Sequence, residues 1–336
     1  MVTNLGRTTH RNIPGTVGEL TTLPTPVSDA PRLASRLGIS GTLLLKRDDL
    51  IGFAVAGNKA RTLEPLVKNA LATNATTLVT GGSVGSNFCQ GAAAAAAWAG
   101  LRCVLVLAGK ESKHPNLAAA KTWGAQVEWT GEPDRNSVDS GIERAAERLS
   151  AEGERTYVCP RGGANPIGAM GFYNAAFELH QQLSQRRISK SVKIVLATGS
   201  GGTLAGLVAG NVSLERPWHI TGASVSRPHD ETNKRVHSLA QEVADLTDGS
   251  TIESDDIHII DARGAGHGIP SAHESRWSDL ALQASGIILD PVYTAKALGA
   301  LPEILGESAE DPALTTIFWH TGGLLDAVAS WEHHDS

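Results

Sequence analysis

Short apolar runs alternate with longer amphipathic stretches over most of this chain. The short runs have the length and the β-branched content of buried strands. They lie at 42–46, 76–80, 102–107, 126–129, 192–197, 219–224, 257–260 and 315–319. The stretches between them are long enough for helices and lie at 59–73, 86–99, 115–123, 134–151, 168–183, 204–212, 230–245, 271–284 and 294–305. This alternation predicts an α/β fold in which helices cover both faces of a mostly parallel sheet.

Two glycine-rich stretches divide this pattern. Residues 56–58 (Ala-Gly-Asn) and 161–166 (Arg-Gly-Gly-Ala-Asn-Pro) bracket a self-contained block of strands and helices. Glycine-rich turns at both ends of such a block are candidate hinges. We therefore predict a small βα domain at 58–165, inserted into a large domain formed by 1–57 and 166–336. In such folds a ligand binds at the carboxyl ends of the strands, often in the cleft between domains.

Composition excludes several classes of function. The 336 residues are 41% hydrophobic and 19% charged, with a formal net charge of −6, which is ordinary for a globular protein. The sequence has no basic footprint for nucleic acid, no apolar run of membrane-spanning length and no apolar signal core. We therefore expect a cytoplasmic protein without nucleic-acid or membrane partners. Cys89, Cys103 and Cys159 lack metal-site spacing, so reduced, buried thiols and no metal are predicted.

The residues at 198–203, Thr-Gly-Ser-Gly-Gly-Thr, follow an apolar run and precede a stretch of small residues. Glycines let the backbone turn tightly, so its N–H groups point at a ligand while the helix N-terminus adds partial positive charge. Such a turn binds phosphate, and neighbouring hydroxyls complete the cradle. The predicted phosphate-binding residues are Gly199, Ser200, Gly201, Gly202 and Thr203.

Two common phosphate sites are excluded by the residues around this turn. A nucleoside-triphosphate loop ends in Gly-Lys-Ser/Thr, but no lysine follows here. A dinucleotide fingerprint needs a third glycine where Leu204 stands. It also needs an acidic residue at the end of the next strand, which here ends in Ala-Ser-Val-Ser. A glycine turn that binds no ligand is the plainer alternative.

Further positions carry groups suited to chemistry. Lys59 follows glycine and asparagine at a predicted helix start, where the helix dipole lowers the pKa of an amine and favours a nucleophile or base. Ser86 and Asn87 stand at a second strand–glycine–helix turn that suits a substrate carboxylate. Tyr293 begins a helix, and Thr321 ends a strand before two glycines. Each has a plainer alternative: a surface lysine, a helix cap or a turn.

Together these motifs resemble one enzyme family. In family order the chain contains Lys-Arg-Asp-Asp, Gly-Asn-Lys-x-Arg-x-Leu-Glu, Gly-x-x-x-Ser-Asn, Thr-Gly-Ser-Gly-Gly-Thr, Gly-x-Gly-x-Gly-x-Pro, Leu-Asp-Pro-Val-Tyr-Thr and His-Thr-Gly-Gly. From residue 23 to residue 323 the chain is similar to the 1-aminocyclopropane-1-carboxylate deaminase/D-cysteine desulfhydrase family. The resemblance implies the tryptophan-synthase-β type of fold (fold type II). Such a fold has two three-layer αβα domains with mostly parallel sheets, and pyridoxal 5′-phosphate lies in the cleft between them.

The resemblance implies how the cofactor would be held. Lys59 would bind pyridoxal phosphate as a Schiff base and then shuttle the Cα proton. The turn at 199–203 would bind the cofactor phosphate, with Asn58 on the ring side. Thr321 would approach the pyridine nitrogen. A neutral hydroxyl there does not keep that nitrogen protonated, so a fully delocalised carbanion is less stabilised and loss of a β leaving group is favoured.

The resemblance also implies a substrate site. Ser86 and Asn87 would face the carboxylate of a small amino acid, with Ser86 taking part in catalysis. Tyr293 would act as an acid/base or hydrogen-bonding partner, and relatives commonly form homodimers. We predict α,β-elimination of a β-substituted, sulfur-containing amino acid of the D or L series to a keto acid and ammonia. The alternatives are a 1-aminocyclopropane-1-carboxylate deaminase, a nucleotide-dependent oxidoreductase and a non-catalytic ligand-binding relative.

Four positions depart from the family pattern. Gly85 replaces a glutamine and Phe88 replaces a histidine, changes expected to enlarge or dry the substrate pocket. His267 and Thr294 stand where ring-opening deaminases have tyrosine and glutamate, which disfavours cyclopropane opening. His267 is either a titrating substrate contact or a hydrogen-bonded loop residue.

Overall fold

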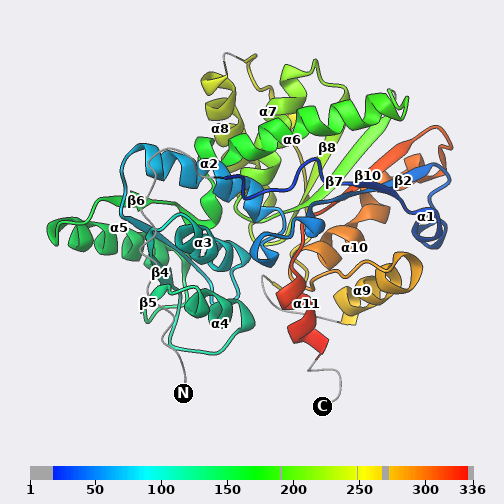
Figure 1. Ribbon diagram of the computed structural model, residues 1–336. Helices are drawn as coiled ribbons and strands as arrows, with labels where there is room; N and C mark the ends of the chain where they lie inside the picture. Colours follow the sequence, from blue (N-terminus) through cyan, green and yellow to red (C-terminus); the bar gives the residue numbers. More distant parts are fainter. Residues whose placement is uncertain (1–17, 190, 248, 267–271, 332–336) are drawn as a thin grey trace, which may run out of the picture.

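The strands form two separate sheets in the computed structural model, which describes residues 18–331 except 190, 248 and 267–271 (Figure 1). The larger sheet has the order β1-β2-β10-β7-β8-β9. Its strands are β1 (Val27–Asp29), β2 (Thr42–Arg47), β7 (Val192–Thr198), β8 (Trp218–Ser224), β9 (His258–Asp261) and β10 (Thr315–His320). All neighbours pair in parallel except β1, which is antiparallel to β2 at the edge.

The smaller sheet is parallel throughout and has the order β5-β4-β3-β6. Its strands are β3 (Thr77–Gly82), β4 (Arg102–Leu107), β5 (Gln126–Trp129) and β6 (Thr156–Val158). All four come from the middle of the chain, whereas the larger sheet takes strands from both sides of it. The domain boundaries at 57/58 and 165/166 stay a prediction.

Helices cover both faces of each sheet (Figure 1). On the larger sheet, one face packs against α6 (Pro166–Gln185), α7 (Gly202–Ser213) and α8 (His229–Leu246), and the other against α1 (Pro31–Leu37), α9 (Ala272–Ser285) and α10 (Thr294–Leu305). Alternate residues of one strand serve the two faces: Ile194 and Leu196 join the first core, and Val195 joins the second. This period-2 burial is what a continuous apolar strand provides.

The smaller sheet is covered in the same way. One face packs against α2 (Lys59–Ala72), α3 (Asn87–Trp98) and α4 (Pro115–Thr122), and the other packs against α5 (Arg135–Ala151). Leu105 and Leu107 of β4 face the first group, while Val104 and Val106 face α5. A last helix, α11 (Leu324–Trp331), follows β10, and single-turn 3₁₀ helices lie at Asp48–Leu50, Phe53–Val55, Arg161–Gly163, Ser254–Asp256 and Gly306–Glu310.

The predicted α/β class and three-layer arrangement are confirmed. Each predicted strand and helix is present within a few residues of its expected bounds, but β1, β6, α1 and α11 were missed. The two missed strands have three residues each and carry no usable alternation. The missed α1 begins at a proline, Pro31, that follows a stretch rich in prolines. The missed α11 was hidden by the two glycines before it, which indicate a turn.

The three cysteines are free and buried, as predicted. Burial raises the pKa of Cys89 to about 11 and the pKa of Cys159 to about 12, so few thiolates form near neutral pH. Within the described ranges, no helix combines the length and the apolar character needed to cross a membrane. Among the same residues, no cluster of three or more His, Cys, Asp or Glu side chains is arranged to hold a metal ion.

Candidate active site

A cavity of about 340 Å³ lies between the two sheets, at the carboxyl ends of their parallel strands. The ends of β3 and β7 both contribute to its wall, so it lies where parallel α/β sheets bind ligands. Most predicted site residues line it: Asn58, Lys59, Ser86, Asn87, Phe88, Gly199, Ser200, Gly201, Thr203, Tyr293 and Thr321. Gly202 does not line the cavity and instead begins α7. His267 lies outside the described residues.

Lys59 is the first residue of α2, as predicted. The backbone N–H of Asn58 donates to the Thr321 carbonyl at 3.0 Å, which ties this helix start to the end of β10. Gly57 has φ of +54°, and a Cβ there would lie 2.6 Å from the same carbonyl oxygen, so the approach needs glycine. Burial lowers the pKa of Lys59 to about 8. The direction agrees with the prediction, and burial is the cause that the structure adds.

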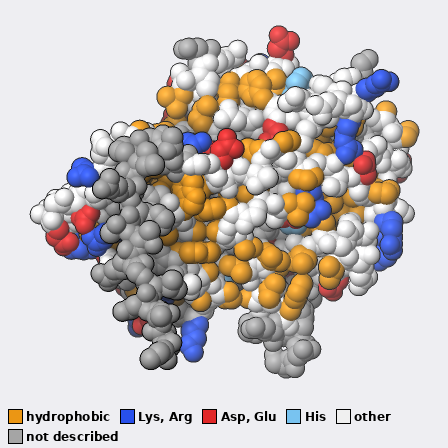
Figure 2. Space-filling view, in the orientation of Figure 1, with side chains coloured by type: hydrophobic (Ala, Val, Ile, Leu, Met, Phe, Trp, Pro, Cys, Tyr) orange, Lys and Arg blue, Asp and Glu red, His pale blue; other side chains and the backbone are white. Residues whose placement is uncertain are grey.

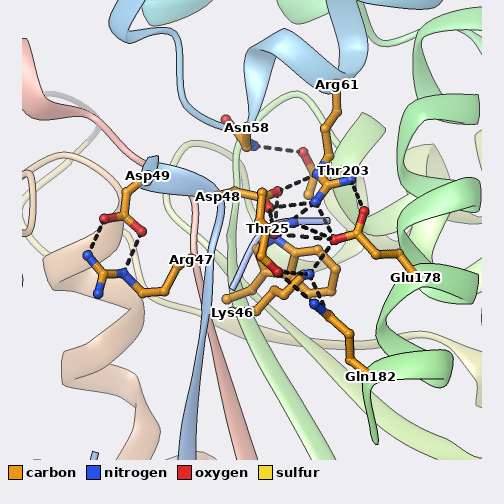
Figure 3. Close-up of polar contacts among 11 residues, drawn as sticks. Thr25, Lys46, Arg47, Asp48, Asp49, Asn58, Arg61, Glu178, Gln182 and Thr203 are labelled. Carbon is orange, nitrogen blue, oxygen red and sulfur yellow. Dashed lines mark hydrogen bonds and ion pairs between the residues drawn. The ribbon is translucent and has the colours of Figure 1, made fainter. Parts of the chain in front are cut away.

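The 198–203 turn joins β7 to α7, and it lines the same cavity as Lys59. Gly201 has φ of +97°, a conformation open to glycine, and α7 begins at the next residue. Asn58 Nδ2 donates to Thr203 Oγ1 at 3.1 Å, so the turn and the start of α2 are in direct contact (Figure 3). The buried Thr198 Oγ1 has no hydrogen-bond partner among the described residues. An orphaned hydroxyl beside a helix N-terminus suits a polar ligand.

Arginines surround this turn, and the sequence analysis missed them. They are Arg135, Arg161, Arg227 and Arg235. Arg227 donates to the Gly199 carbonyl. Arg235 Nε donates to the Ser200 carbonyl at 2.7 Å. Burial, with the charges of its three neighbours, lowers the pKa of Arg227 to about 10. Glu231 and Asp139 offset only part of the charge of these four arginines, so the site favours an anion. Apart from Arg161, which belongs to the glycine-rich stretch at 161–166, they stand outside the motifs that the sequence singles out.

A buried polar network holds the start of α2 from behind (Figure 3). Its members are Thr25, Lys46, Asp48, Arg61, Glu178 and Gln182. Arg61 donates to both carboxylate oxygens of Asp48 at 2.9 and 3.0 Å. Trp319 Nε1 donates to Asp48 Oδ2 at 2.8 Å. Arg61 is two residues beyond Lys59, and Trp319 is two residues before Thr321. Asp48 therefore fixes both backbone segments relative to each other.

Ser86 and Phe88 shape the opposite end of the cavity. Ser86 is the N-cap of α3, and its Oγ accepts from Cys89 N at 3.2 Å, so the plain capping interpretation also holds. Phe88 lines the cavity and is only 2% exposed, which agrees with the expected drying of the pocket. The expected enlargement at Gly85 is wrong. A Cβ there would lie 2.9 Å from His114 Nε2. The space that a side chain at position 85 would fill is therefore occupied by the His114 imidazole and does not add to the cavity.

Tyr293 is held over the cavity by Asp290, a residue that the sequence analysis gave no role. Asp290 Oδ2 accepts from the Tyr293 N–H at 2.8 Å, and Oδ1 accepts from Thr294 Oγ1 at 2.6 Å. Thr294 is thus buried in a helix start and does not line the cavity. Burial raises the pKa of Tyr293, so its hydroxyl stays protonated near neutral pH and can donate a hydrogen bond.

These features fit pyridoxal phosphate. The cofactor needs an amine that is readily deprotonated and a phosphate cradle within one cavity. Lys59 would supply the amine, and the 199–203 turn with its arginines would supply the cradle.

Comparison with known proteins agrees with this fit. The family described as pyridoxal-phosphate dependent enzyme matches residues 19–322. A D-cysteine desulfhydrase from Salmonella choleraesuis (strain SC-B67) is 35% identical over 324 residues, covering 94% of this chain and 95% of the relative. A putative 1-aminocyclopropane-1-carboxylate deaminase from Pyrococcus abyssi is 32% identical over 300 residues, covering 89% of each chain.

Solved structures give the same picture. A crystal structure of a 1-aminocyclopropane-1-carboxylate deaminase homologue superposes with a TM-score of 0.86 at 32% identity, covering 94% of each chain. A fungal L-serine ammonia-lyase from Rhizomucor miehei superposes with a TM-score of 0.68 at 15% identity, which is a likeness of fold alone.

Proposed function

This chain belongs to the pyridoxal-phosphate-dependent enzymes, in the family of the D-cysteine desulfhydrases and 1-aminocyclopropane-1-carboxylate deaminases, and from this premise we propose that it is a β-elimination lyase. The substrate is a small amino acid with a leaving group, such as a thiol, on Cβ. The products are a keto acid, ammonia and the protonated leaving group, with one water consumed. The observation that carries this proposal is the convergence of Lys59, Ser86 and Tyr293 on one cavity.

Lys59 has two tasks in this reaction. Bound pyridoxal phosphate supplies an electron sink for the electrons left at Cα when its proton departs. Lys59 first holds the cofactor through its amine and, once released, takes the Cα proton. A pKa near 8 keeps a useful share of the amine neutral at neutral pH, as a general base requires. Asn58 and Thr321 fix the backbone on either side, so the amine keeps its position during the exchange.

The remaining residues bind the substrate and assist the leaving group. Ser86 and Asn87, at the N-terminus of α3, suit the substrate carboxylate because N–H donors and the helix dipole favour an anion there. Phe88 excludes water from that side of the cavity. Tyr293, protonated near neutral pH, can donate its proton to the departing group.

Product analysis tests this function. Protein loaded with pyridoxal phosphate is incubated separately with D-cysteine, L-cysteine, L-cysteate, β-chloro-D-alanine and 1-aminocyclopropane-1-carboxylate. We expect pyruvate and ammonia in equal amounts from at least one β-substituted amino acid, and none from the Lys59→Ala variant. 2-Oxobutyrate from the cyclopropane would instead identify a deaminase. Loaded protein that releases no keto acid from any of these compounds would exclude the lyase proposal.

We further propose that the protein is a cytoplasmic homodimer. Leu324, Val328 and Trp331 lie at helical spacing on α11 and are 40%, 42% and 45% exposed. Figure 2 displays hydrophobic side chains gathered at the lower centre of this face, over the region where Figure 1 has α11. An exposed apolar row of this kind favours association with a second subunit. Free, buried thiols suit a reducing compartment. Sedimentation equilibrium of the protein and of Val328→Asp tests the dimer.

A further inference from the structure

A carboxylate of α11 reaches the residue that is expected to bind the substrate. Asp326 Oδ2 accepts from Asn87 Nδ2 at 2.8 Å, and Oδ1 accepts from Asn116 Nδ2 at 3.0 Å. Asp326 is 7% exposed, so both contacts are shielded from solvent. Asp326 lies 239 residues from Asn87 and 210 from Asn116, so the cluster joins the last described helix to the starts of α3 and α4.

The cluster decides which end of the Asn87 amide is available to a ligand. A carboxylate only accepts hydrogen bonds, so Asp326 can pair with the NH₂ end of the amide and not with its oxygen. Asn116 Nδ2 lies 3.3 Å from Asn87 Oδ1, but its two N–H groups already donate to Asp326 Oδ1 and to the Gly85 carbonyl at shorter distances, so this third contact is a weaker, shared one. One N–H of Asn87 is left over. Because Asn87 lines the cavity, this N–H is a donor suited to an anion there.

His114 completes the cluster. Its Nδ1 accepts from the Asn116 N–H at 3.2 Å, so in the neutral ring the proton is on Nε2. Nε2 lies 3.5 Å from Asp326 Oδ1, so the proton on Nε2 is close to the carboxylate and favours its ionised form. Asn116 Nδ2 also donates to the Gly85 carbonyl at 2.8 Å, which holds the turn before α3 in the same unit.

We propose that Asp326 is a positioning residue for substrate binding: it orients the Asn87 amide so that an N–H faces the α-carboxylate of the amino acid. This inference rests on the proposed function, in which Asn87 contacts that carboxylate. Asp326 does not itself line the cavity, so it acts only through Asn87.

The positioning depends on the ionised carboxylate, which gives it a pH dependence. Asp326 faces His114 and Asn116 from α4, Asn87 from α3, and the charge of Asp290 before α10. Burial, together with the charge of Asp290, raises the pKa of Asp326 to about 7. A protonated carboxyl group has one oxygen that donates, so it no longer enforces the NH₂ orientation of Asn87. Below about pH 7 the KM for the amino acid is therefore expected to rise.

Two substitutions test the inference in the pyridoxal-phosphate-loaded enzyme. The substrate is D-cysteine if the wild type turns it over, and otherwise the amino acid of the panel that the wild type does turn over. Asp326→Ala removes both acceptors and should raise KM about tenfold, the scale of one hydrogen bond to a charged group, while kcat falls much less. Asp326→Asn keeps the shape but pairs with either end of the Asn87 amide, so it should raise KM and abolish the rise below pH 7. The substrate titrates in the same way with the wild type and with Asp326→Asn, so a difference between their pH profiles is caused by residue 326. Asp279→Asn, at an exposed aspartate of α9, is the control.

The outcomes separate this inference from the proposed function. Wild-type enzyme that turns over no amino acid in the panel overturns the proposed function and, with it, the substrate contact assumed here. Wild-type turnover with an unchanged KM and pH profile in both Asp326 variants overturns the inference alone. Loss of kcat at unchanged KM, or loss of cofactor from Asp326→Asn, would also overturn it, because a structural role would then explain the effect.

Discussion

Asn58 and Thr203 are 145 residues apart in the chain, and their side chains meet at 3.1 Å in the active-site cavity. One belongs to the start of the helix that carries Lys59, and the other to the helix behind the phosphate turn. The contact joins the start of the Lys59 helix directly to the anion cradle. The distance between the two halves of the cofactor site is therefore set by the folded chain itself.

Replacing Lys59 should remove covalent attachment of the cofactor. Lys59→Ala is expected to bind pyridoxal phosphate weakly and to lack the visible absorption that borohydride bleaches in the wild type, because no other described lysine lines the cavity. Absorption spectra before and after borohydride measure this. Lys68→Ala is the matched control, since Lys68 lies on the same helix, is half exposed and pairs with Glu64. Equal spectra for the two variants would contradict the assignment.

Cofactor uptake should depend on pH through Lys59. Its amine attacks the cofactor only when neutral, and burial lowers its pKa to about 8. The rate of reconstitution of apoenzyme is thus expected to increase with pH and to reach half its maximum near pH 8. An unperturbed lysine would place that midpoint near its ordinary value of about 10.4. Stopped-flow absorption of apoenzyme mixed with excess pyridoxal phosphate from pH 6.5 to 10 distinguishes the two.

Two neighbouring aspartates should differ sharply in their effect on stability. Asp48 is buried between Arg61 and Trp319 and is one of the two carboxylates that Arg61 binds, the other being Glu178. Asp48→Asn weakens charge-assisted hydrogen bonds in a buried network and should cost about 1.5–3 kcal/mol of unfolding free energy. Asp49 pairs with Arg47 at a more accessible position, so Asp49→Asn should cost about 1 kcal/mol or less. Urea unfolding of both apoenzymes provides the comparison. Similar losses for the two variants would show that the network is not a cooperative unit.

Restoring the family's glutamine at position 85 should disturb His114 and not reshape the cavity. The new Cβ would lie 2.9 Å from His114 Nε2, the same atom that lies 3.5 Å from Asp326 Oδ1, so a shift of the ring should disturb that contact. Gly85→Gln is therefore expected to raise KM. In Gly85→Gln/His114→Ala the glutamine meets no ring, so the two effects should not add, with a coupling of about 0.5–3 kcal/mol in a double-mutant cycle. Strict additivity of the KM changes would contradict this contact.

Much of the fold was predictable because apolar residues recur with different spacings in the strands and in the helices. Apart from β6, the strands from β2 to β10 alternate or run apolar, and turns separate them from helices. Local pattern gave no signal for the contacts that complete the site. The Asp48 carboxylate, the arginines behind the 199–203 turn and the Asp326 cluster all depend on contacts between residues more than ten positions apart. In a sequence, single charged residues of this kind look like surface positions. The role of Gly85 was misjudged for the same reason, since only the folded chain brings His114 to it.

In the proposed dimer, helix α11 would link association of the subunits to substrate binding. Its inward side holds Asp326 against Asn87, and its outward side carries the apolar row formed by Leu324, Val328 and Trp331. If binding of a second subunit to the outer side holds α11 in place, it also holds Asp326 in place, because both sides belong to one short helix. Thermodynamic linkage makes such coupling reciprocal. Dilution that separates subunits would then weaken substrate affinity, and saturating substrate would hold the subunits together.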